Sequence, residues 1–361
     1  MKKIIRLGII LSSFLIALTH AFAAQPSAPA AKSAFDEKAV ADFYRGKTVR
    51  IIVGFSAGGG FDAYSRVIAR HLGKYIPGNP AVIVDNMAGA GSIIAANYVY
   101  SAGPKDGTVI GNISGPIILE QLFNNPAVQY DMGKFRYLAV PVSETYLMIV
   151  TRKAGVSKLE ETLGPKGKQV VIGAIPGSTV EHGPILVRDV LGANLKVVAG
   201  YKGTADIRLA IDSGEVEGFF NTWTSAKISS PEKFTSGEWL VLAQLGDKPI
   251  KDLPFPHVPA IPAMSRNEEQ RQLLSFGASV PNEFGKSYAL PPGVPAERGA
   301  ALEAAFRKAM ADKEFLAEAE KGKLEIDPLP GDQVQKLVVE FLGMAPDLKA
   351  RLQRLIRPAT K

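Results

Sequence analysis

Apolar runs alternate with glycine loops and amphipathic segments in the first third of the chain. Residues 48–55 form an almost continuous apolar, β-branched run, which is typical of a strand buried on both faces of a sheet. A glycine loop follows, and apolar residues then recur every three or four positions from Phe61 to Tyr75, which predicts one face of a helix. Further strands are predicted at 81–86 and 107–114, so the pattern favours an open, parallel α/β sheet.

The same pattern restarts in the second half of the chain. Strands are predicted at 169–175, 195–201 and 215–223, and the first two are each followed by a loop and a helix. The stretch 239–246 is interpreted as a strand on a return path, followed by a Pro-rich extended crossover between the halves. The tail from Pro295 is predicted to be mostly helical.

These patterns divide the chain into two α/β lobes. We expect lobe one to contain residues 43–147 together with about 240–325, and lobe two to contain residues 148–239 together with the C-terminal helices.

The N-terminus has the pattern of an export signal. Three basic residues precede an apolar run from Leu7 to Leu18, and Ala21-Phe22-Ala23 supplies a small-x-small cleavage motif. We predict a cleaved signal peptide at residues 1–23, a disordered Pro/Ala/Ser-rich tether at 24–42 and a periplasmic location. The alternative, an uncleaved anchor, is disfavoured because the apolar run is shorter than the roughly 20 residues that span a membrane.

Composition narrows the function classes further. The chain has no cysteine, which excludes disulfides, thiolate metal sites and a lipid anchor on cysteine. Its net charge is +7, of which the predicted signal carries three charges, so the mature chain is near 7 − 3 = +4. Because the basic residues are scattered rather than clustered, we expect no nucleic-acid partner, although a modest positive field suits an anionic small molecule.

The first glycine loop fits two kinds of ligand. Gly58-x-Gly60-x-x-Ala63 matches a dinucleotide fingerprint, and Asp85 at the end of the second strand is the matching ribose-binding acid. Export, the long spacing to Asp85 and a second loop of the same form beginning at Gly89 count against a dinucleotide. The loop still predicts an anion-binding site, because a glycine loop at the start of a helix presents backbone N–H groups to any anion, including a carboxylate.

Three such loops end predicted strands: those beginning at Gly58 and Gly89, and residues 176–179 in the second half. Each alone is compatible with a simple tight turn. Loops from two halves that face one cleft instead indicate a two-domain binding protein.

Four segments resemble the periplasmic solute receptors of tripartite tricarboxylate transporters, the Bug-type receptors: residues 50–72, 82–111, 200–220 and 290–316. The resemblance runs from about Gly46 to the C-terminus. It implies a two-lobed Venus-flytrap fold, each lobe a mostly parallel sheet flanked by helices, that binds a small carboxylate. It also implies integral membrane partner subunits, one large and one small. We expect the receptor itself to be a monomer.

The resemblance also implies ligand-binding positions. They are Phe55, Ser56, Ala57, Gly58, Gly59, Gly60 and Asp62 in the first loop, Gly89, Ala90, Gly91 and Ser92 in the second, Ser114 after the third strand, Ser178 and Thr179 in the second lobe, and Tyr201, Lys202 and Gly203. Among these, Lys202 is the candidate charged partner of the ligand. The chain departs from the family pattern where a Trp is usual, since Phe284 and Tyr288 flank that place, and at Pro259-Ala260.

Nothing in the sequence assembles a catalytic or metal site. The four histidines, His20, His71, His182 and His257, belong to neither a His-Glu-x-x-His nor a Gly-x-Ser-x-Gly motif. Asp62 is interpreted as a helix cap rather than a catalytic acid, and His182 is a candidate for facing the pocket. We therefore predict binding without catalysis, cofactor or metal, and keep a secreted α/β hydrolase or lyase as the alternative.

Overall fold

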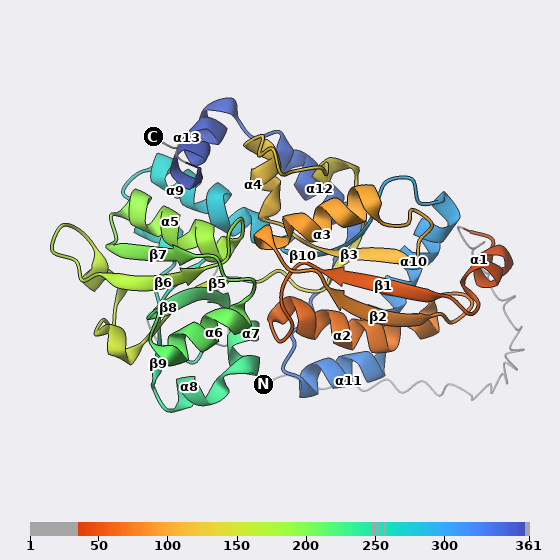
Figure 1. The fold of residues 1–361 in the computed structure, drawn as a ribbon, viewed down its shortest axis with the longest axis horizontal. Coiled ribbons are helices and arrows are strands. Elements are labelled where there is room, and N and C mark those ends of the chain that lie inside the picture. The colour runs from red at the N-terminus through yellow and green to blue at the C-terminus, as the bar shows by residue number, and fades with distance from the viewer. Residues whose placement is uncertain (1–34, 247–249, 251–252, 256–257, 358–361) are drawn as a thin grey trace, which may run out of the picture. The chain divides into compact units, whose positions relative to one another are not determined.

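The computed structural model describes residues 35–246, 250, 253–255 and 258–357. The predicted signal peptide, most of the predicted tether and His257 lie outside these residues. All described residues belong to one compact unit, within which two β-sheets define two lobes (Figure 1).

Lobe one is built on a six-stranded sheet of order β11-β4-β10-β3-β1-β2. The strands are β1 (Thr48–Val53), β2 (Ala81–Asn86), β3 (Val109–Ser114), β4 (Arg136–Val140), β10 (Lys286–Leu290) and β11 (Leu329–Pro330). Strand β1 lies parallel to both β2 and β3, and β10 runs antiparallel between β3 and β4. Ile51 and Ile52 of β1 are fully buried, as expected for a central strand covered on both faces.

Lobe two is built on a five-stranded sheet of order β7-β6-β8-β5-β9. The strands are β5 (Tyr146–Thr151), β6 (Val170–Ala174), β7 (Leu195–Ala199), β8 (Gly218–Thr222) and β9 (Trp239–Leu245). Strand β6 is parallel to β7 and β8, whereas β5 is antiparallel to its neighbours β8 and β9. Both sheets are thus mixed, and each contains three adjacent parallel strands, β2-β1-β3 in lobe one and β7-β6-β8 in lobe two.

Helices cover both sheets (Figure 1). In lobe one they are α1 (Glu37–Tyr44), α2 (Gly60–Leu72), α3 (Ile93–Asn97), α4 (Ile117–Leu122), α10 (Ala296–Met310), α11 (Lys313–Lys321) and α12 (Gly331–Leu342). In lobe two they are α5 (Thr179–Leu191), α6 (Thr204–Ser213), α7 (Trp223–Ser229), α8 (Pro231–Thr235), α9 (Glu268–Leu274) and α13 (Pro346–Ile356). The helical tail from Pro295 is therefore present, although it is shared between the lobes, since α12 packs on β4 and α13 packs on α5 and α9.

The lobe boundaries differ from the prediction. Strand β9, assigned to a return path into lobe one, pairs with β5 in lobe two, where it buries Leu242, Ala243 and Leu245. The following Pro-rich stretch does not cross over at once, because Gln244 pairs with Ala260 and α9 packs on α5. The chain returns to lobe one between α9 and β10. It returns this late because β9 pairs with β5 and so remains in the sheet of lobe two.

The globular part also begins earlier than predicted. Residues 37–42, assigned to the tether, are in helix α1. The Asp36 carboxylate accepts hydrogen bonds from the backbone N–H groups of Lys38 and Ala39, which caps the helix, and Val40 and Tyr44 are buried. Helix α1 could have been predicted from the sequence, because a capping acid, Asp36, precedes two apolar residues four positions apart, Val40 and Tyr44.

Candidate functional site

A cavity of about 420 Å³ lies where loops of the two lobes meet. Lobe one lines it with Phe55, Ser56, Gly59, Gly60, Phe61 and Lys286, and lobe two lines it with Tyr146, Ile175, Ser178, Val180, Thr204, Asn221, Thr222 and Ser225.

Lobe one contributes the loop between β1 and α2. Gly58 has a φ of +82°, a conformation that favours glycine, and Gly59 is the N-cap of α2. At Gly60 a Cβ atom would lie 3.2 Å from Cβ of Ser225 in lobe two, so this loop is a place of close approach between the lobes. Ser56 donates a hydrogen bond across the interface to the Asp206 carboxylate at 3.0 Å.

Lobe two contributes the N-termini of α5 and α6. Ser178 is the N-cap of α5, and its hydroxyl accepts from the Val180 N–H at 3.2 Å and donates to the Ile175 carbonyl at 2.7 Å. Thr204 is the first residue of α6. Together with α2, three helices of more than eight residues therefore begin at this cavity, and Thr222, the N-cap of the shorter α7, lines it as well. Their first N–H groups have no intrahelical acceptor, and their dipoles favour an anion.

Two buried polar atoms at the cavity lack partners. Asn221, at the end of β8, is 2% exposed, and its Oδ1 accepts from the Thr222 N–H at 3.0 Å, yet its Nδ2 has no hydrogen-bond acceptor among the described residues. Ser225 is 5% exposed, and its Oγ also has no partner in the described part of the chain. Buried polar atoms are nearly always hydrogen-bonded, so both atoms are available to a polar ligand or a water molecule in the cavity.

Lys286 is the charged residue among the cavity residues that sequence reasoning missed. It is 4% exposed at the start of β10, and it pairs with the buried carboxylate of Glu144. Burial lowers the pKa of Lys286 to about 7, whereas the Glu144 carboxylate beside it favours the ammonium form. The available signal was a lone cation in a short apolar strand segment, at the place where the chain departs from the family pattern.

The predicted first loop reaches the cavity only in part. Phe55, Ser56, Gly59, Gly60 and, from lobe two, Ser178 line it, whereas Ala57 and Gly58 do not. Asp62 lies in the first turn of α2, where its carboxylate accepts from the Gly58 N–H at 3.0 Å and pairs with Arg66. Burial alone raises the pKa of Asp62, but these two partners and Asn86 outweigh it and hold the pKa below its usual value. Asp62 therefore stabilises the loop rather than facing the ligand.

The second predicted loop makes a contact between the lobes. Gly91 has a φ of +61°, and a Cβ there would lie 2.3 Å from the Pro176 carbonyl oxygen, so the loop containing Gly89, Ala90, Gly91 and Ser92 packs on lobe two. Thr179 is buried at the same interface and donates to Oδ1 of Asn282 at 2.7 Å. Neither this loop nor Thr179 lines the cavity.

The remaining predicted residues also lie outside the cavity lining. Ser114 is buried on β3, in register with Lys286 of β10. Tyr201 donates to the Glu215 carboxylate at 2.6 Å, and Gly203 is the N-cap of α6. The side chain of Lys202 is exposed, and its carbonyl accepts from the Ser56 N–H at 3.4 Å. Lys202 thus contributes its backbone to the lobe interface, whereas the lysine that lines the cavity is Lys286.

Comparison with known proteins gives the fold. No family model matches the chain. It is 23% identical over 330 residues to the UPF0065 protein in the gbd 5′ region of Cupriavidus necator, covering 87% of this chain and 93% of that protein. A UPF0065 protein of Pseudomonas sp. strain P51 is 36% identical over 94 residues, which is 26% of each chain.

Solved structures match over most of their length. The periplasmic binding protein BugD gives a TM-score of 0.67 at 19% identity, over 86% of this chain and 98% of BugD. The chain has the Bug-type periplasmic binding protein fold. MatC from Rhodopseudomonas palustris with bound malate gives 0.61 at 18% identity over 84% and 99%, and an R. palustris protein with adipate gives 0.65 at 19% over 86% and 97%. The predicted family resemblance and two-lobed fold are confirmed, and these neighbours are solute-binding proteins rather than enzymes.

The two histidines that the structure describes, His71 and His182, lie away from the cavity between the lobes. His182 is buried against Glu120 of lobe one, with Nε2 3.7 Å from Oε1, and does not line the cavity. His71 contacts the Glu318 carboxylate at 2.6 Å. His71, Asp312 and Glu314 are close enough to share an ion, but the Lys74 ammonium lies 2.9 Å from Asp312 and 2.8 Å from Glu314 and supplies the positive charge there.

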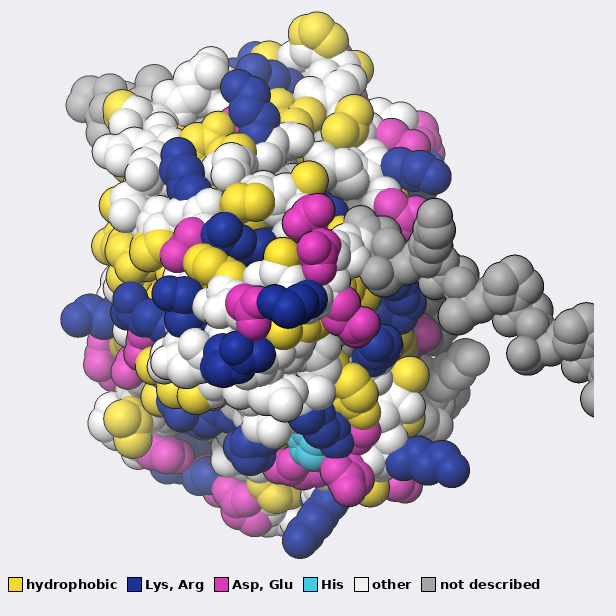
Figure 2. All heavy atoms as spheres, turned by 90° about the vertical axis from the view of Figure 1, so that its right-hand side faces the viewer, with side chains coloured by type: hydrophobic (Ala, Val, Ile, Leu, Met, Phe, Trp, Pro, Cys, Tyr) yellow, Lys and Arg dark blue, Asp and Glu magenta, His cyan; other side chains and the backbone are white. Residues whose placement is uncertain are grey.

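One face of the molecule carries charged side chains of both signs. Figure 2 shows acidic and basic side chains interspersed over one face, without a continuous basic patch. Among the described residues, no helix is both long and apolar enough to cross a membrane.

Proposed function

We propose that this protein is an extracytoplasmic solute receptor that captures a small carboxylate in the cavity between its lobes and delivers it to a tripartite tricarboxylate-type transporter. The N-terminal pattern supports export by a signal peptide cleaved after Ala23. Integral membrane subunits of the transporter are the proposed partners, and the receptor acts as a monomer without a cofactor.

The composition of the cavity wall carries the proposal. Three helices have their N-termini at this cavity. The same wall contains two buried polar atoms that have no partner among the described residues, Nδ2 of Asn221 and Oγ of Ser225. A carboxylate oxygen is an acceptor that satisfies backbone N–H groups and both of these side chains at once. Neighbours of the same fold that contain malate or adipate support a carboxylate as the ligand class.

Delivery follows from the two-lobed arrangement. A ligand that bridges both faces of the cavity stabilises one relative position of the lobes. In that position the two lobes together present a surface that the membrane subunits recognise. The ligand thus acts as the signal for docking as well as the cargo.

A thermal-shift and calorimetry screen tests the proposal. Mature protein is titrated with mono-, di- and tricarboxylates and with the corresponding primary amides as uncharged controls. We expect at least one carboxylate to bind at one site per chain and to raise the melting temperature, since a ligand at 100 times its Kd stabilises the fold by about 2.7 kcal/mol. Amides that bind as tightly as the acids, or no response to any acid, would contradict the proposal.

The same samples test the alternative function. A secreted hydrolase or lyase would convert the bound carboxylate, whereas a receptor returns it unchanged. Mass spectrometry after prolonged incubation should recover only the added compound, and sustained turnover would favour the enzyme.

A further inference from the structure

The ion pair of Lys286 and Glu144 lies where the lobes are joined. Glu144 belongs to the segment 141–145 that connects β4 of lobe one to β5 of lobe two. Lys286 begins β10, directly after the chain returns to lobe one. The Lys286 amine also lies over the rings of Phe61 and Tyr64, 5.2 and 5.3 Å from their centroids, which places it beside the first turns of α2.

A second cavity adjoins the main one at this pair. This smaller cavity, of about 190 Å³, shares the lining residues Phe61, Tyr146 and Lys286 with the main cavity and is additionally lined by Glu144. The Glu144 carboxylate is therefore the group that a ligand end meets if it passes between these shared side chains.

The pair changes the charge balance of the cavity. Among the described residues that line the main cavity, Lys286 has the one formally charged side chain. Glu144 neutralises it, and the net charge of the pair is zero whether the shared proton lies on the amine or on the carboxylate. The positive potential left for a ligand is then that of the helix N-termini, which suits one carboxylate.

Glu144 also has unused acceptor capacity. Its side chain is 8% exposed, and apart from the ion pair with Lys286 neither carboxylate oxygen accepts a hydrogen bond from any described residue. A carboxylate has room for about four hydrogen bonds, so a donor at the far end of the ligand gains a charge-assisted bond here. A second ligand carboxylate gains none and faces a like charge in a buried site.

We propose that the Lys286–Glu144 pair is a specificity determinant, which makes the receptor select carboxylates whose far end is a hydroxyl or ammonium donor and reject dicarboxylates. This inference rests on the proposed carboxylate-binding function and names the ligand class for the same cavity. Burial, which lowers the pKa of Lys286 to about 7, supports it, because the ammonium then depends on Glu144 and is not free to serve a second ligand carboxylate.

The test compares ligands that differ only at the far end. Calorimetry at pH 7 measures the affinities of wild-type protein for butanoate, 4-hydroxybutanoate, 4-aminobutanoate and butanedioate, and for the six-carbon counterparts of all four. In at least one length series we expect the hydroxyl- or ammonium-ended acid to bind about tenfold more tightly than the dicarboxylate, the effect of one charge-assisted hydrogen bond.

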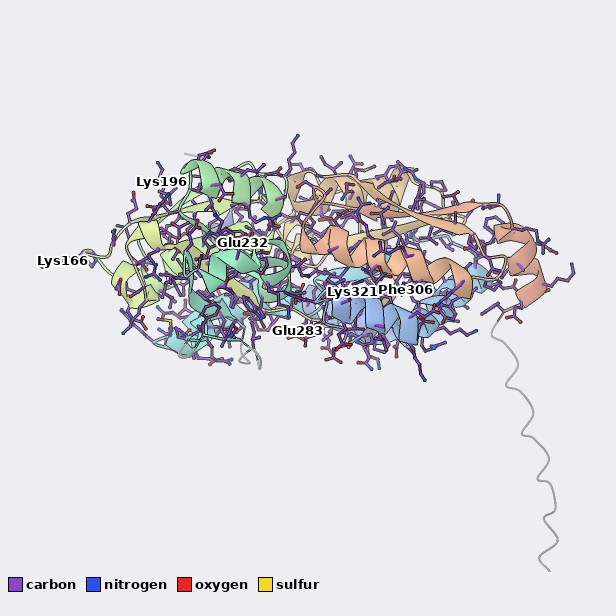
Figure 3. The ribbon with its side chains drawn as sticks, turned by 90° about the horizontal axis from the view of Figure 1, so that it is seen from below. Lys166, Lys196, Glu232, Glu283, Phe306 and Lys321 are labelled. Atoms are coloured by element: carbon purple, nitrogen blue, oxygen red, sulfur yellow. The ribbon has the colours of Figure 1, made fainter. Side chains whose placement is uncertain are left out.

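Two isosteric variants separate the roles of the pair. Glu144→Gln leaves Lys286 unpaired, so the ratio of dicarboxylate to hydroxyl-ended affinity should rise by about tenfold or more. The double variant Lys286→Met with Glu144→Gln should lose the discrimination, and it also serves where either single change fails to fold by circular dichroism. Lys196→Met and Glu232→Gln, exposed positions in lobe two (Figure 3), are matched controls that should leave the ratio unchanged.

Each outcome is decisive. A wild-type protein that binds dicarboxylates as tightly as the hydroxyl-ended acids, or an affinity ratio that folded Glu144→Gln leaves unchanged, would overturn the specificity role and leave the receptor function intact. Failure of wild-type protein to bind any carboxylate in the panel or in the screen described above would instead overturn the proposed function.

Discussion

The two faces of the cavity offer a ligand different kinds of contact. Lobe one contributes mainly backbone, through Gly59 and Gly60 at the start of α2, and one buried amine, Lys286. Lobe two contributes side chains that carry hydroxyl or amide groups, among them Asn221, Thr222 and Ser225. Backbone groups can bind a ligand only where no side chain blocks them, whereas binding by side chains needs particular polar atoms to be present. Adding atoms to lobe one and removing atoms from lobe two should therefore each lower ligand affinity.

The largest effect is expected from adding atoms to lobe one. Gly60→Val places a branched side chain whose Cβ lies 3.2 Å from Cβ of Ser225 and 3.6 Å from Cε of Lys286, so it occupies ligand space and keeps the lobes apart. Calorimetry should show an affinity loss of about 100-fold or more. Gly322→Val, at the end of α11, where a Cβ makes ordinary contacts, is the control. Binding by folded Gly60→Val at near wild-type affinity would contradict the role of this face.

The next effect concerns a contact between the lobes that lies outside the cavity. Burial alone raises the pKa of Glu120, but the facing His182 ring, the Arg357 guanidinium and the Asn125 amide outweigh it and lower the pKa to about 2. A lowered folded-state pKa gives stability that is present above the unfolded-state value of about 4.3 and is lost as pH falls from there toward 2.

The free energy of unfolding of wild-type protein should thus fall by about 3 kcal/mol relative to Glu120→Gln between pH 5 and pH 2. Urea unfolding of both proteins across this range measures the difference. A difference that does not change with pH would show that Glu120 is not held ionised by its partners.

Removing a donor from lobe two should have an effect of similar or smaller size. Asn221→Ala deletes the buried Nδ2, which has no partner among the described residues, so the loss appears in ligand affinity. A hydrogen bond to a charged ligand contributes about 1.5–3 kcal/mol, or roughly 10- to 150-fold in Kd by calorimetry. Unchanged affinity in a folded variant would remove Asn221 from the site.

Ser178→Ala separates a structural hydroxyl from a ligand-binding one. Because this hydroxyl already bonds the Val180 N–H and the Ile175 carbonyl, its removal should cost stability, about 0.5–2 kcal/mol, as for other N-caps. Thermal unfolding should show this change while the Kd shifts less than about threefold, below the effect of one lost hydrogen bond. A larger affinity loss without a change in stability would return Ser178 to the ligand contacts.

The smallest effect is expected at Lys202, the cation favoured by sequence. Its side chain is exposed and does not line the cavity, so Lys202→Ala should leave the affinity unchanged at low and high salt. A loss that shrinks as salt is added would show that Lys202 pairs with the ligand after all.

This contrast explains how much of the site could be predicted. The backbone face was accessible from sequence, since glycines between a strand and an amphipathic helix predict both the turn and the exposed N–H groups. The same periodicity predicted the positions of β1, β2 and β3 in lobe one and of β6, β7 and β8 in lobe two. The side-chain face was not accessible, because Asn221 and Ser225 lie in an ordinary strand-to-helix connection, and the absence of partners for their polar atoms appears only in three dimensions.

Long-range pairing was the other limit. Glu144 and Lys286 lie on separate connections between the lobes, and no local pattern links them. At the second glycine loop, a local pattern was present but misleading. The sequence of this loop is that of a ligand-binding loop, yet in the structure it packs against Pro176 and Gly177 and forms a contact between the lobes. The position of β9 was missed for a similar reason, because its pairing with β5 leaves no trace in its own sequence.

A crystal structure of the mature protein with the tightest carboxylate from the screen tests the central claim most directly. The account predicts the ligand carboxylate within hydrogen-bond distance of backbone N–H groups at the start of α2 and of Nδ2 of Asn221. A larger cavity of about 1,150 Å³ in lobe one, lined by Arg136, Arg307 and Gln335, is the competing location. A ligand found there, with the cavity between the lobes unfilled, would contradict the account.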